Sequence, residues 1–275
     1  GRVLPMIRAF ENGDDVHSLT ARLIMNVILG EQKAAEMDVR SKSFLGDQTH
    51  TWRDWGKKAN HGFNYDWGYK AFALKNEMSE KDGKLVYDSY HTIYPEIQGR
   101  FHRDIRDALK STRTITNLMG RKTLFMSVLD DNVYRAAYSC IPQGTVGDII
   151  NEYGLEYIYY DQHNFSKVEL LTQTHDEIIF QIPLNEECTF EDHAIMLEKI
   201  ISSLEPELTT SHGMKFVIPA DLTMIYSLNT KDAIKEGGCG LSVDHRSCYG
   251  TKQFALKLEE TWRTLDECRK AKAEN

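Results

Sequence analysis

The spacing of hydrophobic residues changes partway along the chain, and this change restricts the fold more than any other feature. Up to about residue 153 the apolar residues recur mostly at helical spacing, beginning with Val16, Leu19 and Leu23. From there the pattern alternates, and Val168–Thr174 and Ile178–Ile182 are predicted to be two strands joined at a turn. Helices and antiparallel strands in separate blocks predict an α+β fold.

The spacing of apolar residues also predicts the remaining elements and their order. After a helix that begins near Val16, helices are expected at 51–69, 84–94, 96–110, 129–153 with an interruption around Pro142, and 191–204. Shorter strands are expected at 114–118, followed by a turn at Gly120, and at 216–228. Residues 229–275 begin with a Gly-rich stretch and end in a charged helix.

Composition limits the class of protein. The 275 residues are 41% hydrophobic, enough for a sizeable core, yet no apolar run approaches the roughly 18 residues of a membrane span. Five scattered Cys and the lack of a signal-peptide pattern predict a cytoplasmic protein. The net charge of -8 argues against nucleic acid, but the segment from Arg100 to Lys122 is locally basic.

One face of the predicted helix 51–69 carries residues that lie four apart along the chain: Arg53, Lys57, His61 and Tyr65. Asn60 and Asn64 fall on the same side. Cationic side chains of this kind could bind a triphosphate, and an aromatic ring at the far end could stack on a base. A solvated helix face would show the same spacing.

A second candidate site is the sequence His175-Asp176-Glu177 between the two predicted strands. Carboxylates between apolar strands are costly unless they have a role, and Mg²⁺ prefers carboxylate oxygens. An exposed carboxylate at a hairpin turn is the alternative. A third segment, Arg135 to Asp148, contains Gln143 and Gly144 after Pro142 and by itself predicts only a break between helices.

Taken in order, these segments resemble the family A, DNA polymerase I-like DNA polymerases. The stretch from Arg53 to Tyr65 is similar to the family's Arg-x3-Lys-x6-7-Tyr motif, and Leu171 to Ile178 to its Leu-x-Gln-x-His-Asp-Glu motif. Three further stretches resemble the family's Asp-Ile-His-x-x-Thr-Ala, Thr-Leu-x-Gly-Arg-Arg and Arg-x3-Asn-x2-(Ile/Val)-Gln-Gly-Thr-x2-Asp motifs: Asp15–Ala21, Thr116–Lys122 and Arg135–Asp148.

The resemblance implies a helical fingers-like region at 10–130, part of an antiparallel palm at 131–228, and a C-terminal extension of unknown role at 229–275. It implies template-directed DNA synthesis from dNTPs on primer-template DNA, with Asp176 as the Mg²⁺ ligand and catalytic residue and Glu177 beside it. The residues implied to bind the nucleotide are His17, Arg53, Lys57, His61 and Tyr65, and those implied to contact DNA are Arg121, Arg135, Gln143 and His175.

The chain also departs from the family pattern. His61 stands where the family has Phe or Tyr, Asp66 where it has Gly, and Ser139 where it has Asn. The family's Asp-x-Ser-x-x-Glu motif, which carries the first catalytic aspartate, is not found in the 275 residues. Two-metal catalysis requires two ions held close together by carboxylates at the reacting phosphate. We therefore expect polymerase activity to need an N-terminal fragment that carries this first aspartate.

Other interpretations of the sequence stay open. The chain could be the C-terminal half of a split, phage-encoded polymerase, a fragment of an intact one, a non-catalytic DNA-binding remnant, or an enzyme like the single-subunit RNA polymerases. Cys239, His245 and Cys248 could hold zinc, although a loop explains them better. Trp52, Trp55, Trp67 and Tyr69 could form a stacking platform, although core packing is the preferred interpretation.

Overall fold

The computed structural model describes residues 4–226 and 240–273, and the chain divides into two compact units between Gln143 and Gly144. The predicted α+β class is confirmed, because helices predominate and the described strands all pair antiparallel. These strands form four two-stranded pairs rather than one continuous sheet. The proposed limits of the fingers-like and palm regions stay predictions.

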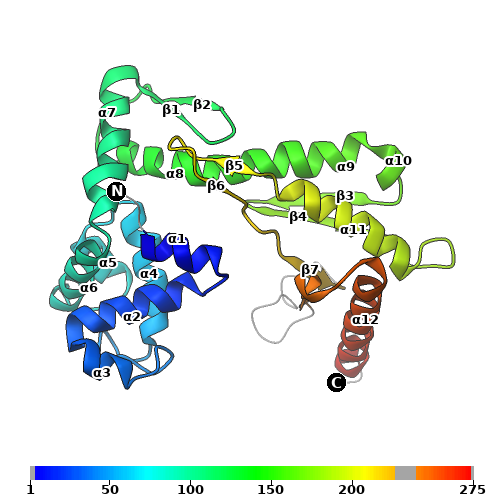
Figure 1. The fold of residues 1–275 in the computed structure, drawn as a ribbon, viewed down its shortest axis with the longest axis horizontal. Coiled ribbons are helices and arrows are strands. Elements are labelled where there is room, and N and C mark those ends of the chain that lie inside the picture. Colours follow the sequence, from blue (N-terminus) through cyan, green and yellow to red (C-terminus); the bar gives the residue numbers. More distant parts are fainter. Residues whose placement is uncertain (1–3, 227–239, 274–275) are drawn as a thin grey trace. The chain divides into compact units, whose positions relative to one another are not determined.

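The first unit is largely helical (Figure 1). Its elements are α1 (Leu4–Glu11), α2 (Val16–Leu29), α3 (Glu31–Ala35), α4 (Trp52–Asn64), α5 (Tyr69–Lys75), α6 (Glu80–Ile93), the π-helical η1 (Ile97–His102), α7 (Arg103–Thr112), β1 (Thr114–Thr116), β2 (Lys122–Leu124) and most of α8 (Asp131–Asp148).

Helices α2, α4 and α6 pack together around the largest core of this unit. Trp52, Trp55, Phe63 and Tyr90 are fully buried there. Packing is therefore confirmed as the role of the two tryptophans. Gly56 lets α4 approach α2 closely, since a Cβ at this position would lie 2.4 Å from the carbonyl oxygen of His17.

Helix α4 is shorter than predicted, because it ends at Asn64 instead of continuing to residue 69. Asp66 adopts a left-handed conformation with φ of 60°, and the Trp67 N–H returns to the carbonyl of Gly62 at 3.1 Å. This is the hydrogen-bond pattern of a Schellman C-cap. Sequence reasoning expects Gly at such a position and overlooks Asp.

A second core in this unit lies between α7, β1 and α8 and contains Ile105, Leu109, Ile115 and Tyr138. Helix α8 continues through Pro142, so the predicted interruption around this residue is wrong. Proline removes one backbone hydrogen bond, but its fixed φ is compatible with a helix. The lost hydrogen bond therefore weakens the helix without ending it.

The second unit contains the end of α8 followed by η2 (Ile149–Leu155, π-helical), α9 (Glu156–Tyr160), α10 (Gln162–Phe165), β3 (Glu169–Thr174), β4 (Glu177–Gln181), α11 (Phe190–Leu204), β5 (Leu208–Thr209), β6 (Lys215–Phe216), β7 (Leu222–Ile225), β8 (Gly240–Val243), η5 (His245–Ser247) and α12 (Thr251–Ala273). The strand predicted at 216–228 is thus divided between β6 and β7, and its last two residues lie outside the described residues.

Strands β3 and β4 form the predicted hairpin, in which Thr174 pairs with Glu177. Phe180 and Ile182 pack against the apolar side chains of α11. No helix in the described part of the chain is long and apolar enough to cross a membrane.

The approach of α2 to α4 can be tested by substituting Gly56. Gly56→Ala places a methyl group against the backbone of His17 and Ala21, so we expect a loss of about 1–3 kcal/mol in the free energy of unfolding. Gly99→Ala is the matched control, because the space around Gly99 is open and alanine favours a helix. Urea denaturation measures both, and equal stability of the two variants would contradict the close approach.

His91 is half-buried in the first core, where its ring lies 4.4 Å from that of Tyr87 and 5.8 Å from that of Phe63. Within the described residues neither of its ring nitrogens finds a hydrogen bond. Burial, reinforced by the charge of His102, lowers the pKa of His91 to about 4. The unfolded state therefore binds a proton more readily than the folded state.

This difference predicts that the first unit loses stability as the pH falls from about 6.5, the value for an unfolded histidine, to about 4. His91→Phe should reduce that loss by on the order of 2 kcal/mol, since no charge then has to enter the core. His163→Phe, which changes an exposed histidine, should leave the dependence unaltered. The measurement is the free energy of unfolding of each variant and of the unaltered chain from pH 7 to pH 4. The same dependence on pH for His91→Phe and the unaltered chain would contradict this prediction.

Candidate active site

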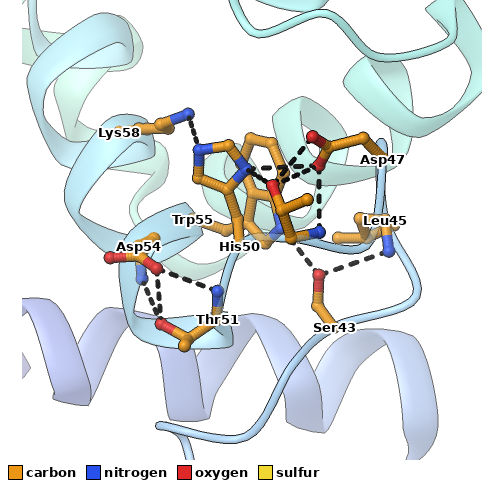
Figure 2. Close-up of polar contacts among 9 residues, drawn as sticks. Ser43, Leu45, Asp47, His50, Thr51, Asp54, Trp55 and Lys58 are labelled. Carbon is orange, nitrogen blue, oxygen red and sulfur yellow. Dashed lines mark hydrogen bonds and ion pairs between the residues drawn. The ribbon is translucent and has the colours of Figure 1, made fainter.

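The beginning of α4 is held by reciprocal capping bonds. The hydroxyl of Thr51 accepts the backbone N–H of Asp54 at 3.1 Å, and the carboxylate of Asp54 accepts the backbone N–H of Thr51 at 2.9 Å. Figure 2 shows this capping box beside the preceding loop. Such a cap fixes the first turn of the helix, which carries Arg53.

The first turn of α2 meets that turn of α4. Asp15 caps α2 by accepting the backbone N–H of His17 at 3.0 Å, and it also accepts Nε–H of Arg53 at 2.5 Å. Burial opposes ionisation of Asp15, but the hydrogen bonds from Arg53, Ser18 and the backbone of His17 together hold its pKa far below the usual range. Arg53 is therefore positioned by a permanently charged partner.

His17 lies within the field of the cations on α4. Burial is the largest influence that lowers its pKa, and the charges of Arg53, Lys57 and His61 lower it further, against the opposing charge of Asp15. The structure thus brings together four of the five predicted nucleotide-binding residues. A cluster of this charge, with Lys57 and His61 exposed, can bind an anion such as a triphosphate.

The neighbouring lysine, Lys58, belongs to a different contact set. Its Nζ lies 2.8 Å from Nε2 of His50, whose Nδ1 lies 3.4 Å from Asp47, as Figure 2 shows. Burial lowers the pKa of Lys58, and its ammonium group also lies 4.7 Å from the ring of Trp55. Lys57 and Lys58 therefore have different surroundings although they are adjacent in sequence.

The two asparagines of α4 do not extend the cationic face as the sequence suggested. Asn60 is buried and binds Thr20 and His17, whereas Asn64 accepts the hydroxyl of Tyr90 at 2.9 Å. Their amides are used inside the protein because helices α2 and α6 cover that side of α4.

Tyr65, the fifth predicted nucleotide-binding residue, is half-buried at the C-terminal end of α4 and contacts the ring of His61 edge-on at 5.6 Å. The next residue, Asp66, accepts a hydrogen bond from Arg106 at 2.7 Å, and Arg106 also donates to the hydroxyl of Tyr138 at 2.5 Å. These bonds tie the end of α4 to α7 and α8. Sequence reasoning missed them, although an Asp in place of the family's Gly was the available signal.

In the second unit the His175-Asp176-Glu177 sequence forms the tip of the β3–β4 hairpin. His175 and Asp176 make a two-residue loop, and His175 has φ of 53°. All three side chains are exposed. Two-residue hairpin turns need a positive φ at the first loop position, and His is one of the non-glycine residues that adopt it most readily, so the tight turn accounts for this conformation.

Asp176 and Glu177 supply hard carboxylate oxygens, which suit Mg²⁺, but two neighbouring carboxylates alone do not make a metal site. Within residues 4–226 and 240–273, no three His, Cys, Asp or Glu side chains are gathered closely enough to hold a metal ion. The zinc alternative gains no support among the described residues, and Cys239 lies outside them.

Apart from His175, the predicted DNA-contacting residues occupy two further places. Arg121 is exposed after a turn that the buried side chain of Asn117 holds by accepting the N–H groups of Met119 and Arg121. Arg135 and Gln143 are on α8, where Arg135 donates to Asn132 at 3.3 Å and Gln143 is exposed. These residues do not join the His17 cluster within the first unit.

Comparison with known proteins gives the same family that the motifs suggested. The sequence profile described as DNA polymerase family A matches residues 3–214. DNA polymerase I of Helicobacter pylori is 25% identical over 182 residues, covering 64% of this chain and 18% of that protein. DNA polymerase I of Treponema pallidum is 25% identical over 222 residues, covering 78% and 19%, and that of Lactococcus lactis is 28% identical over 191 residues, covering 66% and 20%.

The chain thus spans about a fifth of the length of these curated relatives. A solved structure, the POL domain of Pol1 from M. smegmatis in complex with DNA primer-template and dNTP, matches with a TM-score of 0.55 and 20% identity. The match covers 72% of this chain and 33% of that one, and it supports the fold. Because the family profile extends from residue 3 to residue 214, this chain belongs to the family A DNA polymerases.

Proposed function

We propose that the chain takes part in template-directed DNA synthesis and that the paired first turns of α2 and α4 bind the triphosphate of the incoming dNTP. The observation that carries this proposal is the clustering of Arg53, Lys57 and His61 around His17. Membership of the family A polymerases supports it. In this proposal residues 10–130 are fingers-like and residues 131–228 are part of the palm.

In this proposal each side chain on the shared face of α2 and α4 has a separate role. Arg53 and Lys57 neutralise the triphosphate, His17 donates a hydrogen bond to it, and Tyr65 lies beside the template base. His61 takes the position next to the nucleotide sugar. Arg121, Arg135, Gln143 and His175 contact the primer-template, where the basic segment Arg100–Lys122 adds attraction for the phosphate backbone.

In the second unit, Asp176 is the proposed metal ligand, with Glu177 beside it. Family A polymerases use Mg²⁺, which stabilises the charge that develops when the primer 3′-hydroxyl attacks the α-phosphate of a dNTP. A two-ion site needs a further carboxylate besides this adjacent pair, and within residues 4–226 and 240–273 no third His, Cys, Asp or Glu side chain joins them to form a metal-binding group. We propose that this carboxylate comes from a segment outside the 275 residues.

Primer extension tests this function. The chain mixed with a polymerase fragment that carries Asp-x-Ser-x-x-Glu should extend a primer in the presence of Mg²⁺, whereas the chain alone should not. Efficient extension by the chain alone would show that both carboxylates lie within it. Failure of the mixture to bind or extend primer-template DNA would favour a non-catalytic role.

The two adjacent lysines of α4 allow a matched comparison. Lys57→Ala should raise the KM for dNTP or lower kcat by about 10- to 100-fold, because a charged contact to the triphosphate is lost. Lys58→Ala removes an equal charge from the His50 side and should change either constant by less than about threefold. Steady-state kinetics of the assembled enzyme at varied dNTP is the measurement. Equal changes in KM or kcat for the two variants would indicate that the face carrying Arg53, Lys57 and His61 is an ordinary solvated helix face.

The carboxylate at the hairpin tip can be examined in the same assay. Asp176→Ala should lower the incorporation rate by at least about 1000-fold while affinity for primer-template stays within about threefold, because the residue acts on the reacting phosphate. Glu186→Ala, which removes another exposed carboxylate of the second unit, should retain normal activity. A near-normal rate for Asp176→Ala would rule out its role as a metal ligand.

A further inference from the structure

A chain of hydrogen bonds runs from the core of the first unit to His17. The hydroxyl of Tyr94 lies 3.0 Å from Oγ1 of Thr20, which lies 3.1 Å from Oδ1 of Asn60. Nδ2 of Asn60 lies 3.2 Å from Nδ1 of His17. Tyr94 and Thr20 are fully buried and Asn60 is 6% exposed, so these groups have little access to water.

Such a chain can carry its protons in either direction, and the two directions give His17 different tautomers. In the outward direction Tyr94 donates to Thr20, Thr20 donates to Asn60, and the amide of Asn60 donates to Nδ1 of His17. His17 then carries its proton on Nε2. The inward direction requires the amide of Asn60 to turn over, so that its oxygen accepts from Nδ1–H of His17 and its nitrogen donates to Thr20. Thr20 then donates to Tyr94, and His17 carries its proton on Nδ1.

The outward direction is favoured by the burial of Tyr94. Its hydroxyl proton is used when Tyr94 donates to Thr20. In the inward direction the hydroxyl only accepts, and no other acceptor among the described residues is within hydrogen-bond distance of its proton. A buried donor without an acceptor costs roughly 1–3 kcal/mol, and burial raises the pKa of Tyr94, so the phenol keeps this proton. In the outward direction each of the four groups has a complementary partner.

We propose that Tyr94 is a positioning residue for the nucleotide site: through Thr20 and Asn60 it holds His17 as the tautomer whose Nε2–H can donate to a phosphate oxygen. The proposal rests on the proposed function of this face. In the other tautomer Nε2 would present a lone pair to the triphosphate, which repels phosphate oxygens.

The charged groups around His17 agree with a neutral donor. Arg53, Lys57 and His61 oppose a positive charge on His17, and Asp15 on its own helix is already engaged by Arg53. A protonated ring would also direct Nδ1–H at the amide N–H of Asn60. The face therefore combines two permanent cations with one neutral, directional donor.

The tautomer can be measured without any polymerase activity. Long-range ¹H–¹⁵N NMR of the ¹⁵N-histidine-labelled chain, with His17 assigned through His17→Gln, should give the Nε2–H pattern. Tyr94→Phe removes only the hydroxyl, and the Nε2–H pattern should be lost or mixed with Nδ1–H. Tyr90→Phe is the matched control, since this buried phenol binds Asn64 outside the chain of bonds, and His17 should be unaffected.

A second variant keeps the proposal testable if Tyr94→Phe does not fold. Asn60→Asp replaces the amide donor with a carboxylate, which should accept from Nδ1–H and convert His17 to the other tautomer. An Nδ1–H pattern in the unaltered chain, or the same pattern in every variant, would overturn the proposal.

Kinetics separates this proposal from the proposed function. Tyr94→Phe should raise the KM for dNTP about tenfold in the assembled enzyme, while Tyr90→Phe leaves it within about twofold. If the tautomer changes and the KM does not, the chain of bonds stands but His17 does not bind the triphosphate. An altered KM with an unaltered tautomer would refute the role of Tyr94.

Discussion

The close packing of α2 against α4 at Gly56 is the constraint on which the candidate site depends. Because this position has no side chain, the backbone of His17 can approach the middle of α4. The approach places the N-terminal turns of both helices side by side, and Asp15 can then both cap α2 and bind Arg53. A wider separation would leave Arg53, Lys57 and His61 as an ordinary solvated face.

The electrostatics of the face follow from that packing. Asp15 compensates one cation and orients it, while among the described residues the remaining positive charge has no equivalent acidic partner close to His17. Lys58 shows the contrast, since its ammonium group contacts His50 and Trp55. The buried polar bonds behind the face, from Tyr94 to Asn60, satisfy groups that would otherwise destabilise the core, and they also determine how His17 is presented.

Much of the fold could be predicted from hydrophobic spacing, including α2, α6, α11 and the β3–β4 hairpin, because their periods are strong. The end of α4 could not, since Asp66 adopts the conformation expected of glycine, and neither could the continuity of α8 through Pro142. Four-residue spacing was sufficient to place Arg53, Lys57 and His61 on one face. The inward use of Asn60 and the Asp15–Arg53 pair depend on which helix packs against α4, and local spacing carries no information about that contact.

The most direct test is to locate the nucleotide. A structure of the chain with primer-template DNA, Mg²⁺, a non-hydrolysable dNTP and the complementing polymerase fragment would reveal the position of the triphosphate. We expect its oxygens within hydrogen-bond distance of Arg53, Lys57 and Nε2 of His17. A triphosphate bound elsewhere, with this face still in solvent and Arg53 still paired only with Asp15, would contradict the account.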